Sequence, residues 1–196
     1  MKTSMETNIE LRTGNWLLVV GPRAICPTLL ALTARLAEVG PVRVVDGGNH
    51  YNVYPVARAA RGQPEVLERI RVSRAFTCHQ MLALLESLPA GPVPFVVLDL
   101  LGTFYDENVR AGERKRLLGQ CLAHLNRLVE PSAPRGAEAA DGGLWPPRLG
   151  AGVVSAHPPR VPSQTARELL ELLTAAAREA FYVQMAAPAP VPMRLF

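Results

Sequence analysis

The stretch Trp16-Leu-Leu-Val-Val-Gly-Pro-Arg-Ala-Ile-Cys-Pro-Thr28 decides the fold. Its first five residues form an unbroken apolar run of strand length, and Gly21-Pro22 ends that run with a turn. From Thr28 to Val39 apolar residues recur at helical spacing, and Gly40-Pro41 ends the helix. A buried strand followed directly by a helix opens a β-α-β unit, so this stretch predicts a parallel sheet covered by helices.

The same alternation of strands and helices continues along the chain. Further strands are predicted at 42–45, 70–73, 95–99 and 152–155, and helices at 53–61, 65–69, 78–88, 113–129 and 164–182. This order predicts one α/β domain over residues 15–185, a three-layer sandwich with a mainly parallel sheet. We interpret residues 1–14 as a lead-in, 131–150 as a flexible Pro- and Gly-rich surface insertion, and 186–196 as a Pro-rich tail.

Composition argues against a membrane-spanning, a disulfide-rich and a metal-binding protein. A chain of 196 residues, 48% of them hydrophobic, suits one domain with a sizeable core. Its longest apolar runs have strand length and the N-terminus lacks a signal-peptide core, so we expect a cytoplasmic protein without a membrane span. Because Cys26, Cys78 and Cys121 are far apart and odd in number, we expect neither a disulfide framework nor a metal site.

Residues 21–28 stand where a phosphate-binding loop would stand, between a strand and a helix. In the P-loop signature GxxxxGK[ST], backbone amides wrap phosphate oxygens, the Lys reaches the terminal phosphates and the Ser or Thr holds magnesium. Gly21 and Thr28 match this signature at the right separation, but Cys26 replaces the second Gly and Pro27 replaces the Lys. Pro27 donates no amide hydrogen and Cys26 adds bulk, so the loop is degenerate.

With the later strand ends in the same order, the chain resembles the RecA/RadA recombinase family from residue 14 to residue 160. Val44-Val-Asp-Gly-Gly-Asn49 is similar to the strand end that carries the family's catalytic Glu, with Gly48 at the Glu position and Asp46 as the nearest acid. Phe95-Val-Val-Leu-Asp99 resembles the Walker B strand, and His157 takes the place of the nucleotide-sensing Gln. The resemblance implies a RecA-like P-loop NTPase core.

The departures from the family pattern all concern residues that nucleotide hydrolysis needs. The P-loop Lys, the catalytic Glu and the sensor Gln are all replaced. The resemblance therefore implies a vestigial nucleotide site with no catalytic residues and no useful hydrolysis, formed by Gly21, Arg23, Thr28, Asp46 and Asp99. We expect no cofactor, and the alternative is that Thr28 and Asp99 still hold magnesium and ATP. It also stays open that Asp46 only forms a turn and that Asp99 only caps its strand.

Basic residues near two strand ends point to nucleic acid. The net charge is +4, which also fits the Arg-rich composition of a high-GC genome. In the recombinases, the loops after the fourth and fifth strands contact single-stranded DNA. The corresponding basic residues here are Arg110, Arg114, Lys115, Arg116 and Arg160, with the aromatic Phe104 and Tyr105 nearby for base stacking. A merely solvated charged face is the competing interpretation.

The C-terminal tail points to a further partner, the replicative sliding clamp. Met193, Leu195 and Phe196 resemble the short motif by which bacterial proteins dock on the replicative sliding clamp, although Pro192 stands where that motif has Gln. A frayed end is the alternative interpretation.

The sequence thus leads to a hypothesis with two rivals. The hypothesis is a non-hydrolysing recombinase paralogue that assists DNA repair or recombination by binding single-stranded DNA, a recombinase or repair protein, or both. One rival is an active ATPase in which Arg23 replaces the P-loop Lys. The other is a purely structural subunit of a larger assembly.

Overall fold

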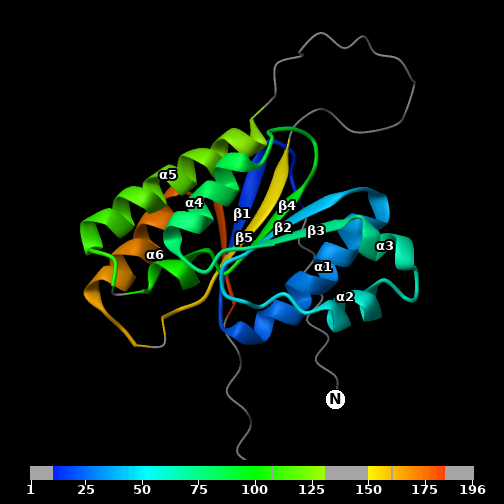
Figure 1. The fold of residues 1–196 in the computed structure, drawn as a ribbon, viewed down its shortest axis with the longest axis horizontal. Helices are drawn as coiled ribbons and strands as arrows, with labels where there is room; N and C mark the ends of the chain where they lie inside the picture. The colour runs from blue at the N-terminus through cyan, green and yellow to red at the C-terminus, as the bar shows by residue number, and fades with distance from the viewer. Residues whose placement is uncertain (1–10, 107, 131–149, 160, 184–196) are drawn as a thin grey trace, which may run out of the picture.

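A six-stranded sheet, parallel throughout, forms the centre of the molecule (Figure 1). The computed structural model describes residues 11–106, 108–130, 150–159 and 161–183. The strand order is β3-β2-β4-β5-β1-β6. The strands are β1 (Asn15–Val20), β2 (Val42–Asp46), β3 (Ile70–Arg74), β4 (Phe95–Leu98), β5 (Ala151–Ala156) and β6 (Glu179–Tyr182). The predicted α/β class and parallel sheet are confirmed.

Helices cover both faces of this sheet (Figure 1). One face carries α1 (Cys26–Val39), preceded by the short helix η1 (Arg23–Ile25), with α2 (Val53–Ala59) and α3 (Pro64–Glu68). The other face carries α4 (Cys78–Ser87), the short helix η2 (Leu100–Phe104), α5 (Ala111–Val129) and α6 (Gln164–Ala176). Among the described residues, none of these helices is both long and apolar enough to cross a bilayer.

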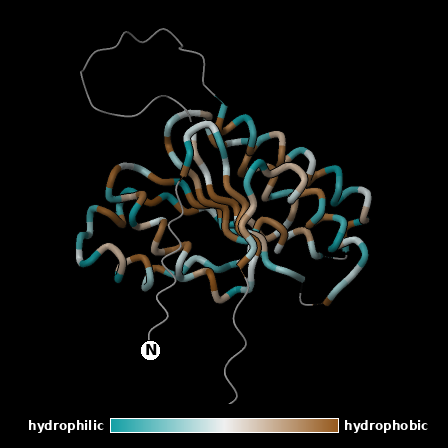
Figure 2. The backbone as a smooth tube through the Cα atoms, turned by 180° about the vertical axis from the view of Figure 1, so that it is seen from behind, coloured by the Kyte–Doolittle hydropathy of each residue, from teal (hydrophilic) through white to brown (hydrophobic). Residues whose placement is uncertain are grey.

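The strands between these two layers are buried on both sides. Leu17 and Val19 of β1 pack against the α1 layer, whereas Leu18 and Val20 pack against the α5 layer, because successive side chains of a strand point to opposite faces. Figure 2 shows the resulting hydrophobic band of strands between the helices. A strand that is buried on both faces is apolar at every position, which is why the run Trp16–Val20 predicts it.

The final predicted helix, 164–182, is wrong in its last third. Helix α6 ends at Ala176, and Glu179–Tyr182 forms the edge strand β6 beside β1. The amide of Val183 continues this pairing by donating to the carbonyl of Val20 at 2.8 Å. Without β6 the backbone groups of β1 would be open on that side, so pairing with β1 overrides the helical periodicity of the segment.

The sheet order brings four loops to one place. Parallel strands end at the same edge, and β4 and β5 lie between β2 and β1. The segments that follow β1, β2, β4 and β5 therefore converge at the carboxyl edge of the sheet. Ligands of open α/β sheets bind at this edge.

Several sequence-based predictions lie outside the described residues. They concern the lead-in up to residue 10, the insertion 131–149, Arg160, and the tail with Met193, Leu195 and Phe196.

Candidate functional site at the carboxyl edge of the sheet

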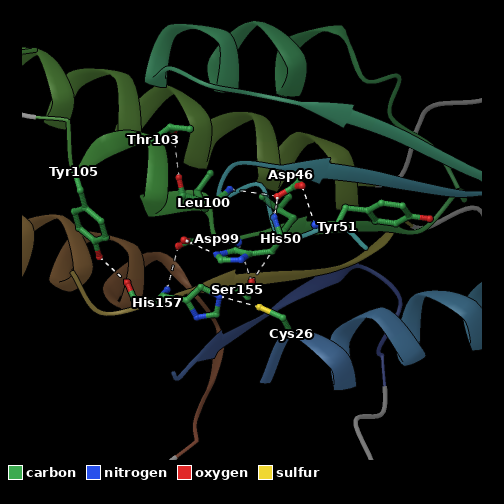
Figure 3. Close-up of polar contacts among 12 residues, drawn as sticks. Cys26, Asp46, His50, Tyr51, Asp99, Leu100, Thr103, Tyr105, Ser155 and His157 are labelled. Atoms are coloured by element: carbon green, nitrogen blue, oxygen red, sulfur yellow. Dashed lines mark hydrogen bonds and ion pairs between the residues drawn. The ribbon is translucent and has the colours of Figure 1, made fainter. Parts of the chain in front are cut away.

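Asp46 is the fully buried last residue of β2. Its Oδ1 accepts hydrogen bonds from the amides of Gly48 (3.3 Å) and His50 (2.9 Å), and its Oδ2 accepts one from the amide of Tyr51 (2.9 Å). Arg74, at the end of β3, lies 3.5 Å from the same carboxylate. Asp46 therefore shapes the turn after β2 and holds His50 over the edge of the sheet (Figure 3).

Asp99 follows β4 in the left-handed region, with φ 51°, and is only 2% exposed. Its amide donates to Ser155 Oγ at 2.9 Å, and its Oδ1 accepts from the amide of His157 at 3.2 Å. Its Oδ2 lies 3.3 Å from His50 Nε2. These contacts tie the ends of β4 and β5 to the loop after β2.

Gly48 lies directly against the pair of His50 and Asp99. A Cβ atom at position 48 would lie 2.4 Å from His50 Cδ2 and 2.7 Å from Asp99 Oδ2. The pairing of His50 with Asp99 leaves no room for a side chain there. Replacing Gly48 by Glu would displace His50.

His157 and Cys26 meet between β5 and α1 (Figure 3). His157 Nδ1 lies 2.8 Å from the carbonyl oxygen of Gly21. A carbonyl only accepts, so Nδ1 carries the ring hydrogen and Nε2 presents a lone pair. That lone pair faces Cys26 Sγ at 3.3 Å.

Burial sets the protonation of this pair. His157 is 3% exposed, and its burial lowers the pKa of the imidazole, which therefore stays neutral. Burial, reinforced by the charge of Asp99, raises the pKa of the Cys26 thiol to about 11. In the protein alone the pair is a thiol beside a neutral imidazole.

Residues 21–28, where the sequence predicts a degenerate phosphate loop, form no open cradle. Residues 23–25 wind into η1, where the amide of Ile25 donates to the carbonyl of Pro22 at 3.0 Å. The Gly21 carbonyl is bonded to His157, and the His157 ring stands edge-to-face against His50 with centroids 4.9 Å apart. Thr28 is exposed on α1. The structure brings three of the predicted nucleotide-site residues to one edge of the sheet, namely Gly21, Asp46 and Asp99. The side chains of Cys26, His50 and His157 lie among them.

A cavity of about 510 Å³ adjoins this cluster. Its walls come from the loop after β1, the segment after β4, the segment after β5 and the start of α6, and both Asp99 and His157 line it. The other lining residues are Arg23, Gly102, Tyr105, Asp106, Arg114, Pro158, Pro159, Val161, Ser163 and Ala166. The cavity is therefore built largely by the two segments that the sequence predicts to contact DNA.

Arg114 is the buried cation of this cavity, with 7% of its surface exposed. Its Nη1 donates to the carbonyl of Phe104 at 3.2 Å, and its Nε has no hydrogen-bond partner in the part of the chain that the structure describes. An unsatisfied donor on a buried guanidinium is costly and suits an anionic ligand.

Of the other predicted DNA-binding residues, the three that the structure describes do not line this cavity. Arg110 is exposed before α5, Lys115 Nζ lies 2.6 Å from Glu168 Oε2 on α6, and Arg116 Nη2 lies 2.6 Å from Glu113 Oε1. Of the two predicted stacking residues, Tyr105 lines the cavity, whereas Phe104 is fully buried in the core.

Sequence reasoning missed the cluster of Cys26, His50 and His157, whose ligand atoms lie within 4.8 Å of one another. Spacing along the chain does not identify this cluster, because its three residues come from three separate segments. The available signal was positional, since each residue follows the end of a predicted parallel strand.

Comparison with known proteins adds no relative. No protein-family model matches the chain, and no curated protein sequence matches it.

Proposed function

We propose that this chain is a non-hydrolysing, RecA-like accessory factor in DNA repair or recombination, and that it binds the backbone of single-stranded DNA in the cavity beside Arg114. The observation that carries the proposal is the position of the cavity between the segments after β4 and β5. In the recombinases that the sequence resembles, the two corresponding loops contact single-stranded DNA.

Two guanidinium groups at the cavity offer hydrogen-bond donors to an anionic ligand. Arg114 offers an Nε that has no partner among the described residues, and the exposed Arg23 adds a second guanidinium from the loop after β1. The carboxylates of Asp99 and Asp106 also line the cavity and balance the two guanidinium charges, so the support for an anion is the buried Arg114 donor and not the net charge of the cavity. Charge-assisted hydrogen bonds from Arg to phosphate are the strong contacts that such a site makes.

The state of the phosphate loop supports the absence of hydrolysis. Phosphoryl transfer depends on positioning the phosphates and neutralising their charge. Here Pro27 stands at the Lys position, Gly48 stands at the Glu position, and the carbonyl of Gly21 is bonded to His157.

The proposal is tested by the fluorescence anisotropy of labelled single-stranded DNA, titrated with the full chain at two salt concentrations, with and without ATP and magnesium. We expect binding that weakens with salt and ignores ATP. Arg114→Gln removes one charge-assisted contact and should weaken binding about tenfold or more. Arg23→Gln should weaken it less, because Arg23 is exposed.

Arg116→Gln is the matched control, because Arg116 lies on the same helix but pairs with Glu113 away from the cavity. It should leave the affinity unchanged, and circular dichroism checks that each variant is folded. Binding that requires ATP and magnesium would favour the rival ATPase. The absence of DNA binding by the unmodified chain would contradict the proposal and favour a partner protein, reached for instance through the tail residues Met193, Leu195 and Phe196.

A further inference from the structure

Three metal-ligating side chains meet at the carboxyl edge of the sheet. Cys26 comes from the start of α1, His50 from the loop after β2 and His157 from the residue after β5. One ligand atom from each lies within 4.8 Å of the other two. Cys26 and His157 are buried and His50 is partly buried. Thiol and imidazole groups in such proximity form the donor set that zinc prefers.

Their spacing is close to that of a tetrahedral site. With bonds of about 2.1 Å to nitrogen and about 2.3 Å to sulfur, a nitrogen and a sulfur ligand lie about 3.6 Å apart. Cys26 Sγ and His157 Nε2 already stand at 3.3 Å. Two nitrogen ligands of such a site lie about 3.4 Å apart, so bringing the His50 ring nitrogen from within 4.8 Å to these spacings takes a side-chain movement of at most about 1.4 Å.

Both imidazoles have one nitrogen engaged and one free. His157 donates from Nδ1 to the Gly21 carbonyl and presents Nε2 to Cys26. His50 Nε2 lies 3.3 Å from Asp99 Oδ2, and in the tautomer that donates there Nδ1 has a lone pair. A second hydrogen bond from the far side of the ring, to a carbonyl or a carboxylate, is the usual support of a metal-binding histidine.

The charges also balance. Cys26 is 8% exposed and Asp99 2% exposed, so an isolated cation would be poorly solvated there. On binding, a divalent cation displaces the thiol proton of Cys26 to solvent, and the thiolate and the Asp99 carboxylate together offset its two charges. Neutral histidines add no charge.

We propose that Cys26, His50 and His157 bind one Zn²⁺ ion, with Asp99 as its charge-balancing neighbour. Cys26 stands at the position that the resemblance to a phosphate loop gives to the second Gly. The inference does not rest on DNA binding. Its rival is a network in which the thiol and the imidazoles bind only one another.

Metal content and cobalt spectroscopy distinguish a Zn²⁺ site from a network of hydrogen bonds among the three side chains. The full chain is stripped with a chelator, dialysed against Zn²⁺ and measured by mass spectrometry of the metal, with about one ion per chain expected. Titration with Co²⁺ should then produce a thiolate-to-cobalt charge-transfer band and the intense visible bands of tetrahedral cobalt. Binding of neither metal would overturn the proposal.

Variants identify the ligands. Cys26→Ser should abolish the charge-transfer band and weaken Zn²⁺ binding by about tenfold or more. His50→Ala should weaken Zn²⁺ binding by a similar factor, although the Cys26 thiolate is still present as a ligand. The two variants therefore test the sulfur and the nitrogen ligand separately. Circular dichroism checks that each variant is folded.

Cys78→Ser is the matched control, because Cys78 is also a buried cysteine near a histidine, with Sγ 3.7 Å from His79 Nδ1. It should leave the cobalt spectrum unchanged. A band that survives Cys26→Ser, or that disappears in Cys78→Ser, would place the metal elsewhere and overturn the proposal.

Discussion

At Gly152 in β5, the ring of Phe95 on the neighbouring strand lies where a side chain would begin. The two residues are in register, and a Cβ atom at position 152 would lie 2.2 Å from Phe95 Cζ. Phe95 is 2% exposed and has no room to withdraw. We expect Gly152→Ala to lower the free energy of unfolding by about 1 to 3 kcal/mol, measured from the midpoint of urea unfolding.

The control for this change is another glycine. A Cβ atom at Gly119, on the exposed side of α5, would meet nothing within 4 Å. Gly119→Ala should raise the free energy of unfolding by about 0.5 to 1 kcal/mol, because alanine loses less backbone entropy in a helix. Equal effects of the two substitutions would show that the Phe95 contact does not limit position 152.

Between elements, Arg127 of α5 holds the end of α4. Its Nη2 donates to the carbonyls of Leu85, Glu86 and Leu88 at 2.9 to 3.2 Å. The last carbonyls of a helix have no partner within it, and a cation there also suits the helix dipole. Arg127→Met keeps most of the side-chain bulk and should cost about 1.5 to 3 kcal/mol of unfolding free energy in urea titrations.

Arg116→Met on the same helix is the comparison. Arg116 forms an exposed ion pair with Glu113, so its loss should cost under about 1 kcal/mol. A loss for Arg127→Met as small as that for Arg116→Met would mean that α4 and α5 are held together by their apolar contacts alone.

Over the whole molecule, both helical layers share one sheet, so we expect them to unfold together. Cys121 reports on the α5 layer. Burial raises the pKa of its thiol to about 12, so at pH 8 in the native protein it is a buried, unreactive thiol. Alkylation of Cys121, followed by mass spectrometry, should rise with urea at the midpoint seen by far-ultraviolet circular dichroism. Labelling at clearly lower urea would instead reveal separate opening of the α5 layer.

The candidate site was predictable only in part. Gly21, Asp46 and Asp99 lie at the predicted edge, since the end of a buried parallel strand is visible as a run of apolar residues followed by a polar one. Arg114 was predicted to bind DNA together with Lys115 and Arg116. The structure separates the three, because helical phase within α5 buries Arg114 at the cavity while Lys115 and Arg116 turn outward. A cluster of charges in sequence does not reveal this difference.

By itself, the sequence determined the class of fold, because strands buried on both faces and amphipathic helices carry their own periodicity. The degenerate phosphate loop at residues 21–28 stays a prediction from the sequence. Only the tertiary structure decided that Glu179–Tyr182 is a strand, because the open side of β1 accepts it. Likewise, only the tertiary structure brought Cys26, His50 and His157 together, because proximity between distant segments depends on the order of strands in the sheet and not on spacing along the chain.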